Sequence, residues 1–202
     1  MNRRRALMGA KSGIKLLYSL YNKSVTAGES IDTNLNIFDG QTDVTILIDY
    51  QNTSNPTSSS SDGRTCKLLW FQGIISAGTN GRVFNLGKYS GSSPSYSVWW
   101  FNENAASHTL DDGASAASRK RFAVRHNTNS GTITVWEKIG SNAIKTHTFT
   151  ATFINQNRTL CIGHGTDTAQ GLAPGTIHSC EVYNGILSDE DVTDYLNNGR
   201  TV

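Results

Sequence analysis

A two-residue period in the apolar side chains decides what this chain can fold into. The period is clearest over residues 43–50 (DVTILIDY), where every second residue shares a face of an extended backbone. The residues of one face are Val44, Ile46 and Ile48, and those of the other are Thr45, Leu47 and Asp49. Because aliphatic residues stand on both faces, we predict a strand at the centre of a sheet.

The same period recurs along the chain at short intervals. Further strands are predicted at residues 67–76, 81–88, 95–102, 120–126, 132–138, 145–153, 159–164 and 176–183. Residues 127–131 (NTNSG) have the glycine and polar residues of a hairpin loop. With 17% charged residues, 19 glycines and 3 prolines, the composition suits short strands joined by polar turns. We therefore predict an all-β protein, a jelly-roll sandwich of two antiparallel sheets.

One short helix is predicted near the end of the chain. Ser188 can cap its first turn, with Asp191 three residues later, and Gly199 can end it. The apolar residues on one helical face are Val192, Tyr195 and Leu196. We expect this stripe to lie on the sandwich.

The first 29 residues differ from the others in charge. Three arginines (Arg3, Arg4 and Arg5) begin a series of six positive charges that precede the first acid, Glu29. Since the whole chain has a net charge of +2, the remainder carries −4, which argues against a nucleic-acid-binding face on the sandwich. We predict that residues 1–29 form a partly helical docking arm, and that residues 30–202 fold as a sandwich without it. The apolar docking residues are Leu16, Leu17, Tyr18 and Tyr21.

Targeting and cysteine patterns give further expectations. The apolar stretch at residues 6–10 is interrupted by Lys11, so no signal peptide is predicted. No stretch approaches the roughly 18 apolar residues of a membrane span. The three cysteines (Cys66, Cys161 and Cys180) are odd in number and far apart, which predicts buried free thiols rather than disulfides or a zinc site.

Three segments resemble laminin-G-like domains. They are residues 36–49 (NIFDGQTDVTILID), 121–136 (RFAVRHNTNSGTITVW) and 176–187 (TIHSCEVYNGIL), the last followed by SDED. Together they span most of residues 30–199, and the resemblance implies a sandwich of the concanavalin A-like lectin type. Residues 1–13 (MNRRRALMGAKSG) resemble the start of phage and prophage structural proteins. That resemblance implies a virion appendage, such as a head-fibre, decoration or tail-associated protein.

The carboxylates lack the spacing of a glycosidase site. Such enzymes use two carboxylates about 5 to 10 Å apart. Asp43 and Asp49 share a strand but lie roughly 20 Å apart at about 3.3 Å per residue, whereas Glu137 and Glu181 are isolated in separate strands. We predict no catalytic residue. The candidate calcium ligands are the loop carboxylates of Asp111 and Asp112, and no other cofactor is expected.

Aromatic residues are the better candidates for a binding site, because sugar rings stack on them. Residues 95–102 carry large rings on both faces of the predicted strand, so one set can fill the core while the other needs a ligand or a subunit interface. The candidate ligand-binding residues are Tyr96, Trp99, Trp100, His164 and Asp167. Trp70 and Trp136 are expected in the core.

The function predicted from the sequence is that of a non-enzymatic virion protein whose lectin-like sandwich binds host or mucosal glycans. One alternative is an architectural spacer or decoration that binds only other virion proteins. Another is a cell-surface carbohydrate-binding module. The predicted partners are virion proteins through the arm, glycans and further copies of the chain, with no membrane or nucleic acid. The predicted location is the virion, assembled in the host cytoplasm.

Overall fold

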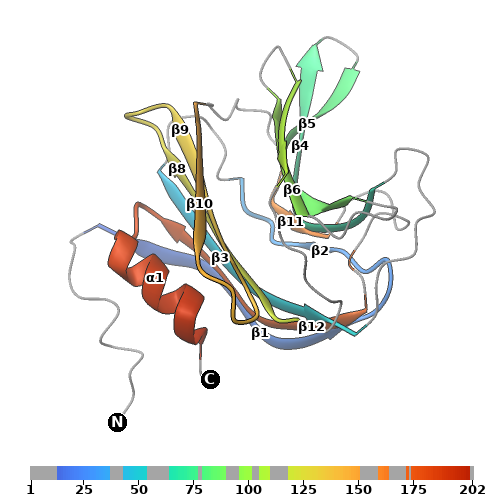
Figure 1. Ribbon diagram of the computed structural model, residues 1–202. Helices are drawn as coiled ribbons and strands as arrows, with labels where there is room; N and C mark the ends of the chain where they lie inside the picture. Colours follow the sequence, from blue (N-terminus) through green and yellow to red (C-terminus); the bar gives the residue numbers. More distant parts are fainter. Residues whose placement is uncertain are drawn as a thin grey trace.

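The described part of the chain forms two packed sheets and one helix (Figure 1). The computed structural model describes residues 13–36, 43–53, 64–76, 79–89, 96–101, 105–109, 118–150, 159–163, 172 and 174–200, and between residues 64 and 109 it describes the backbone. Sheet A contains, from edge to edge, β1 (Lys15–Val25), β12 (Gly175–Asn184), β3 (Val44–Asn52), β8 (Lys120–Asn127), β9 (Thr132–Ile139) and β10 (Lys145–Thr150). Sheet B contains β2 (Ile31–Asp32), β11 (Cys161–Ile162), β4 (Arg64–Ser76), β5 (Thr79–Tyr89), β6 (Tyr96–Phe101) and β7 (Ala105–Thr109). Neighbouring strands pair antiparallel throughout, which confirms the predicted sandwich.

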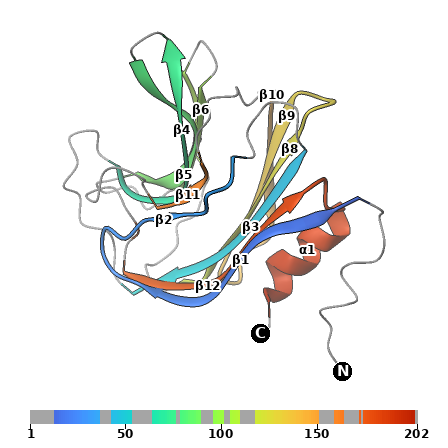
Figure 2. The same ribbon diagram turned by 180° about the vertical axis from the view of Figure 1, so that it is seen from behind.

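The centre of sheet A is buried on both faces. Every residue of β3 from Val44 to Tyr50 is buried, as predicted for a central strand. Ile48 packs in the core between the sheets, together with Ile162 of β11. Leu47 points the other way and packs beneath the helix α1 (Asp189–Asn198). Figures 1 and 2 show α1 on the face of sheet A that is turned away from sheet B.

The helix begins and ends where the sequence predicts. The Ser188 hydroxyl accepts the N–H of Asp191 at 3.2 Å, and the Asp191 carboxylate accepts the N–H of Ser188 at 3.3 Å. Such a reciprocal cap satisfies two backbone donors that the first turn would otherwise leave without partners. Gly199 ends the helix with φ of 66°, a conformation that favours glycine. Within the described residues, no helix is long and apolar enough to cross a membrane.

Two other local predictions are confirmed. The amide oxygen of Asn127 accepts the N–H groups of Asn129 and Ser130 at 3.0 and 3.1 Å, which closes the loop between β8 and β9. Cys161 and Cys180 are buried free thiols, as predicted, whereas the side chain of Cys66 lies outside the described part of the chain. Burial raises the pKa of the Cys161 thiol to about 11, so this group stays protonated at neutral pH.

The prediction of an arm is wrong for residues 15–25. They form β1, which pairs with β12 from Lys15 opposite Asn184 to Val25 opposite Gly175. An irregularity in the pairing at Leu17 breaks the two-residue period, and this is why the apolar residues there resemble part of a helix. Leu17, Tyr18 and Leu20 pack against the core between the sheets. The expected boundary at residue 29 therefore cuts off an edge strand of the sandwich, while Arg3, Arg4 and Arg5 lie outside the described residues.

Candidate functional site

The aromatic strand that the sequence indicates is β6, which lies between β5 and β7 in sheet B. Tyr96, Trp99 and Trp100 all belong to it. Trp99 stands opposite Asn85 on β5 and Ser107 on β7. The ladder of pairs continues across the sheet, because Asn85 stands opposite Trp70 on β4.

Trp70, Asn85 and Trp99 thus form one row across three adjacent strands, which we call the tryptophan row. Residues that face each other in a sheet share the same face. Beyond Trp70 the row continues through Cys161 on β11 to Asp32 on β2, and Asp32 is exposed. The row therefore belongs to the exterior face of sheet B, the face turned away from sheet A.

The adjacent row belongs to the opposite face. It runs from Ile162 on β11 through Leu69 and Leu86 to Val98 on β6. Ile162 is fully buried in the core between the sheets, so this row faces sheet A. Trp100 lies two residues beyond Val98 and takes a position on the same core side. The strand thus places Trp99 on the exterior face of sheet B and Trp100 on the face toward sheet A.

Sequence reasoning missed two members of the row. Trp70 was expected in the core, but its register places it on the exterior face with Trp99. Asn85 gave no signal, because its position between two tryptophans arises from strand pairing alone. Trp136, by contrast, is a core residue as predicted, 6% exposed, with the Arg125 guanidinium 4.5 Å from the centre of its ring.

The row places two tryptophans on one face of the sheet with an asparagine between them. Trp70 and Trp99 are separated by one intervening strand, which corresponds to roughly 10 Å between their backbone positions. Indole rings bind the apolar faces of sugars, and an amide between them can exchange hydrogen bonds with hydroxyl groups. The next residue of β5 on the same face is Gly87, which brings no side chain.

The position of His164 and Asp167 relative to β6 stays a prediction. His164 and Asp167 lie outside the described residues, after β11. Ile162 at the end of β11 is three strand spacings from Val98, roughly 14 Å, because β4 and β5 lie between them. Asp111 and Asp112 also lie outside the described residues, so calcium binding stays a prediction. Among the residues that the structure describes, no group of His, Cys, Asp or Glu is arranged to hold a metal ion.

The carboxylates Glu137 and Glu181 occupy opposite faces of sheet A. Glu137 on β9 stands opposite Phe122, a residue of the core between the sheets. Glu181 on β12 stands opposite Leu47, which packs beneath α1. With β3 and β8 between their strands, the two backbones lie roughly 14 Å apart. They do not form the carboxylate pair of a glycosidase.

Two charged clusters hold the helix side of sheet A together. Asp49 is fully buried and accepts hydrogen bonds from Arg119 Nε and Nη2, each at 2.7 Å, and from Arg121 Nε at 2.9 Å. Arg121 Nη1 also donates to the carbonyls of Leu196 and Asn197, the last turn of α1. The cluster therefore ties β3 and β8 to the negative end of the helix.

The second cluster centres on Glu181. Its carboxylate accepts the hydroxyls of Tyr21 and Tyr183, each at 2.6 Å, and the guanidinium of Arg200 at 3.0 Å. Burial and the hydrogen bond to Glu181 raise the pKa of Tyr21 to about 12. Because Tyr21 belongs to β1 and Arg200 follows α1, this cluster fastens an edge strand and the end of the chain to β12.

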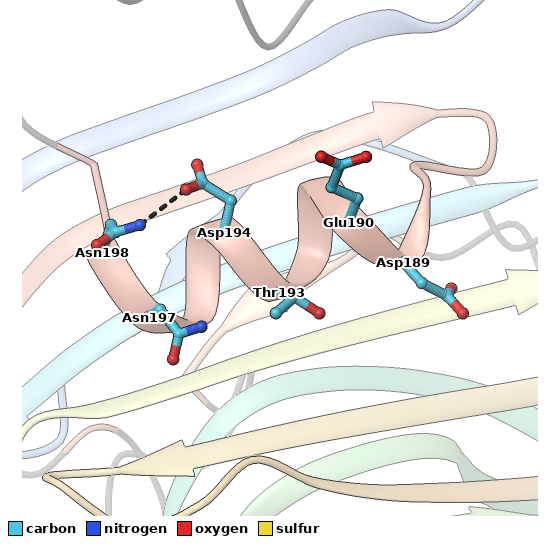
Figure 3. Close-up of a pocket in the computed structure, with 6 residues that line it drawn as sticks. All are labelled: Asp189, Glu190, Thr193, Asp194, Asn197 and Asn198. Atoms are coloured by element: carbon cyan, nitrogen blue, oxygen red, sulfur yellow. Dashed lines mark hydrogen bonds between the residues drawn. The ribbon is translucent and has the colours of Figure 1, made fainter.

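A shallow acidic pocket lies on the outer face of α1 (Figure 3). It is lined by Asp189, Glu190, Thr193, Asp194, Asn197 and Asn198. Asn198 donates a hydrogen bond to Asp194 at 2.7 Å. The acids of the first turn stabilise the positive end of the helix, which accounts for them without a ligand.

No family model matches the sequence, and no curated protein matches it. Solved structures of the same fold include the CBM40 of the Ruminococcus gnavus IT-sialidase bound to α2,3-sialyllactose, at 14% identity and a TM-score of 0.58 over 88% of this chain and 97% of that one. The NanB sialidase of Streptococcus pneumoniae, as its K499G mutant, matches at 13% identity and a TM-score of 0.58 over 87% of this chain and 27% of that one. The leech intramolecular trans-sialidase matches at 17% identity and a TM-score of 0.56 over 93% of this chain and 28% of that one. At these identities the similarity shows a lectin-like jelly-roll sandwich.

Proposed function

We propose that this protein is a non-catalytic carbohydrate-binding module and that the tryptophan row is the surface that receives the sugar. The observation that carries the proposal is the register that aligns Trp70, Asn85 and Trp99 on the exterior face of sheet B. Two indole platforms with an amide between them offer what a sugar needs: apolar stacking and a directional hydrogen-bonding group.

Two findings support this assignment. The module of the R. gnavus sialidase, which has the same fold, was solved with sialyllactose bound. The carboxylates Glu137 and Glu181 are too far apart to act as a glycosidase pair. A binding module, the alternative that the sequence already offered, therefore accounts for more of the observations than an enzyme does.

The test is a glycan array followed by titration calorimetry on wild-type protein and on Trp99→Ala and Trp70→Ala. We expect each variant to lose about 1 to 3 kcal/mol of binding free energy, or roughly 5-fold to 150-fold in affinity. Trp99→Tyr should retain most of the binding, because a phenol ring still stacks. Thr146→Ala, on the exposed face of β10 in the other sheet, is the matched control and should bind as the wild type does.

Wild-type affinity in both alanine variants, with unchanged unfolding midpoints, would exclude the tryptophan row as the binding surface. If Trp99→Ala unfolds the protein, the comparison passes to Trp99→Tyr, and a complete loss of binding in that folded variant would equally contradict a stacking role.

Display on a virion is a finer proposal, supported by the resemblance of residues 1–13 to phage structural proteins. The comparisons with solved structures do not bear on it. Fractionation of producing cells tests it: co-sedimentation with assembled particles supports a virion protein, whereas recovery at the cell surface supports the cell-surface module. A protein that sediments with particles yet binds no glycan would be an architectural spacer or decoration.

A further inference from the structure

The tryptophan row runs across the strands rather than along one of them. Its members lie on β4, β5 and β6, each one strand spacing from the next. The backbone positions of the two tryptophans therefore lie roughly 10 Å apart in the direction perpendicular to the strands, and a ligand that contacts both would have to lie along that direction. A single sugar ring, about 5 Å long, spans only about half of this backbone separation.

The spacing fits a sugar chain in extended form. A pyranose unit advances along such a chain by a length close to one strand spacing, about 5 Å. Rings separated by one unit would then stack on Trp70 and Trp99, and the unit between them would lie over Asn85. In an extended β1,4-linked chain, alternate rings present the same orientation, as two platforms on one sheet face require.

The residue beside Asn85 on the same face of β5 is Gly87, which has no side chain. On the same face, the next row consists of Lys67, Gly87 and Ser97, so a glycine lies beside Asn85 where substituents of the middle unit would project. Beyond Trp99 the row ends at Ser107 on β7, the edge strand of sheet B. At the other end, Cys161 is only 7% exposed. Further sugar units would therefore extend past the edge strand β7 rather than over the buried Cys161.

We propose that the tryptophan row binds an unbranched glycan of at least three sugar units, laid across the strands, rather than a single terminal sugar. This inference rests on the proposed function and specifies its ligand class. It also assigns Asn85 as a specificity-determining residue that contacts the middle unit.

The test is calorimetry with three β1,4-linked series, of glucose, mannose and N-acetylglucosamine, from one to five units. In at least one series the affinity should rise at least about tenfold between the dimer and the trimer, when the second platform becomes occupied. Trp70→Ala and Trp99→Ala should each lower trimer affinity to that of the dimer. Asn85→Ala should weaken the trimer and leave a monosaccharide unaffected. Trp99→Tyr should restore the step and serves as the folded comparison.

The outcomes separate this inference from the proposed function. If a free monosaccharide, including N-acetylneuraminic acid, binds as tightly as any longer glycan, the multi-unit site is wrong while the module still binds sugar. Binding of sialyllactose without a length-dependent step in any series would have the same meaning. If none of these sugars and nothing on the array binds, the proposed function itself is overturned.

Discussion

Replacing the buried Asp49 by asparagine tests the physical account of how the helix side of sheet A is held together. Asp49→Asn keeps the size of the side chain and removes its charge. The guanidinium groups of Arg119 and Arg121 would then meet one neutral oxygen and one N–H donor in place of the carboxylate.

The magnitude follows from the exposure of the three partners. The Asp49 side chain is 0% exposed and that of Arg121 is 13% exposed, so their interaction is poorly screened by water. Removing one partner of a buried ion pair costs about 3 to 5 kcal/mol. Arg119 is 36% exposed and can be solvated when its partner is lost, which places the expected cost at about 3 kcal/mol, the lower end of the range. Arg119→Gln should lower the free energy of unfolding by only about 1 kcal/mol, because water screens the partly exposed Arg119 side chain.

Urea unfolding, followed by far-ultraviolet circular dichroism, measures these differences through the midpoint at constant slope. Asp194→Asn is the matched control, because Asp194 is exposed on α1 and its change should stay within about 0.5 kcal/mol. An Asp49→Asn protein that unfolds within about 0.5 kcal/mol of this control would show that the cluster is not a stabilising network.

Three further predictions concern the frame of the sandwich. Deleting residues 1–26 should lower the free energy of unfolding by at least about 3 kcal/mol or prevent folding, because β1 covers the edge of β12 and part of the core; equal midpoints for the full and shortened chains would contradict this. Tyr21 has a folded-state pKa of about 12 against an ordinary value of 10.0, so the stability it contributes is complete below pH 10 and is lost as the pH rises toward 12. Thermal melts between these pH values should therefore show a smaller fall in the unfolding midpoint for Tyr21→Phe than for wild type. Gly175→Ala should lower the free energy of unfolding by more than about 2 kcal/mol, since an added methyl group would meet the Gln51 carbonyl. Gly140→Ala, with open space around it, should lower it by about 1 kcal/mol because of its left-handed backbone alone. Similar unfolding midpoints for the two glycine variants would show that the close approach at β12 is not tight.

The elements that the sequence predicted well are those with strong local signals. The apolar residues of β3 repeat every second position on both faces, and every residue from Val44 to Tyr50 is buried. The helix was predicted to its cap at Ser188, because capping depends on residues only three positions apart. The hairpin loop at residues 127–131 likewise closes through its own side chain.

The elements that sequence reasoning missed have weak or broken local signals. β2 contains two residues, and the five residues of β7 (AASHT) include no large apolar side chain. In β1 an irregularity at Leu17 interrupts the period, and the positive charges of the segment suggested an arm. β1 and β2 pair with strands distant in the sequence, and β7 pairs with the neighbouring β6, so each depends on its partner more than on its own residues.

The candidate site shows the same division between local pattern and strand pairing. The sequence by itself determined that Trp99 and Trp100 lie on opposite faces of one strand, because side-chain direction alternates with each residue. It did not determine which face lies outside or what stands beside each ring. Only the tertiary structure decided that Trp70, Asn85 and Trp99 share an exterior row, since the register of β4, β5 and β6 aligns them and the pairing of β4 with the distant β11 shows which face is outside. A shift of one residue in that register would have placed a different set of side chains on the exterior face, from the same sequence and the same strands.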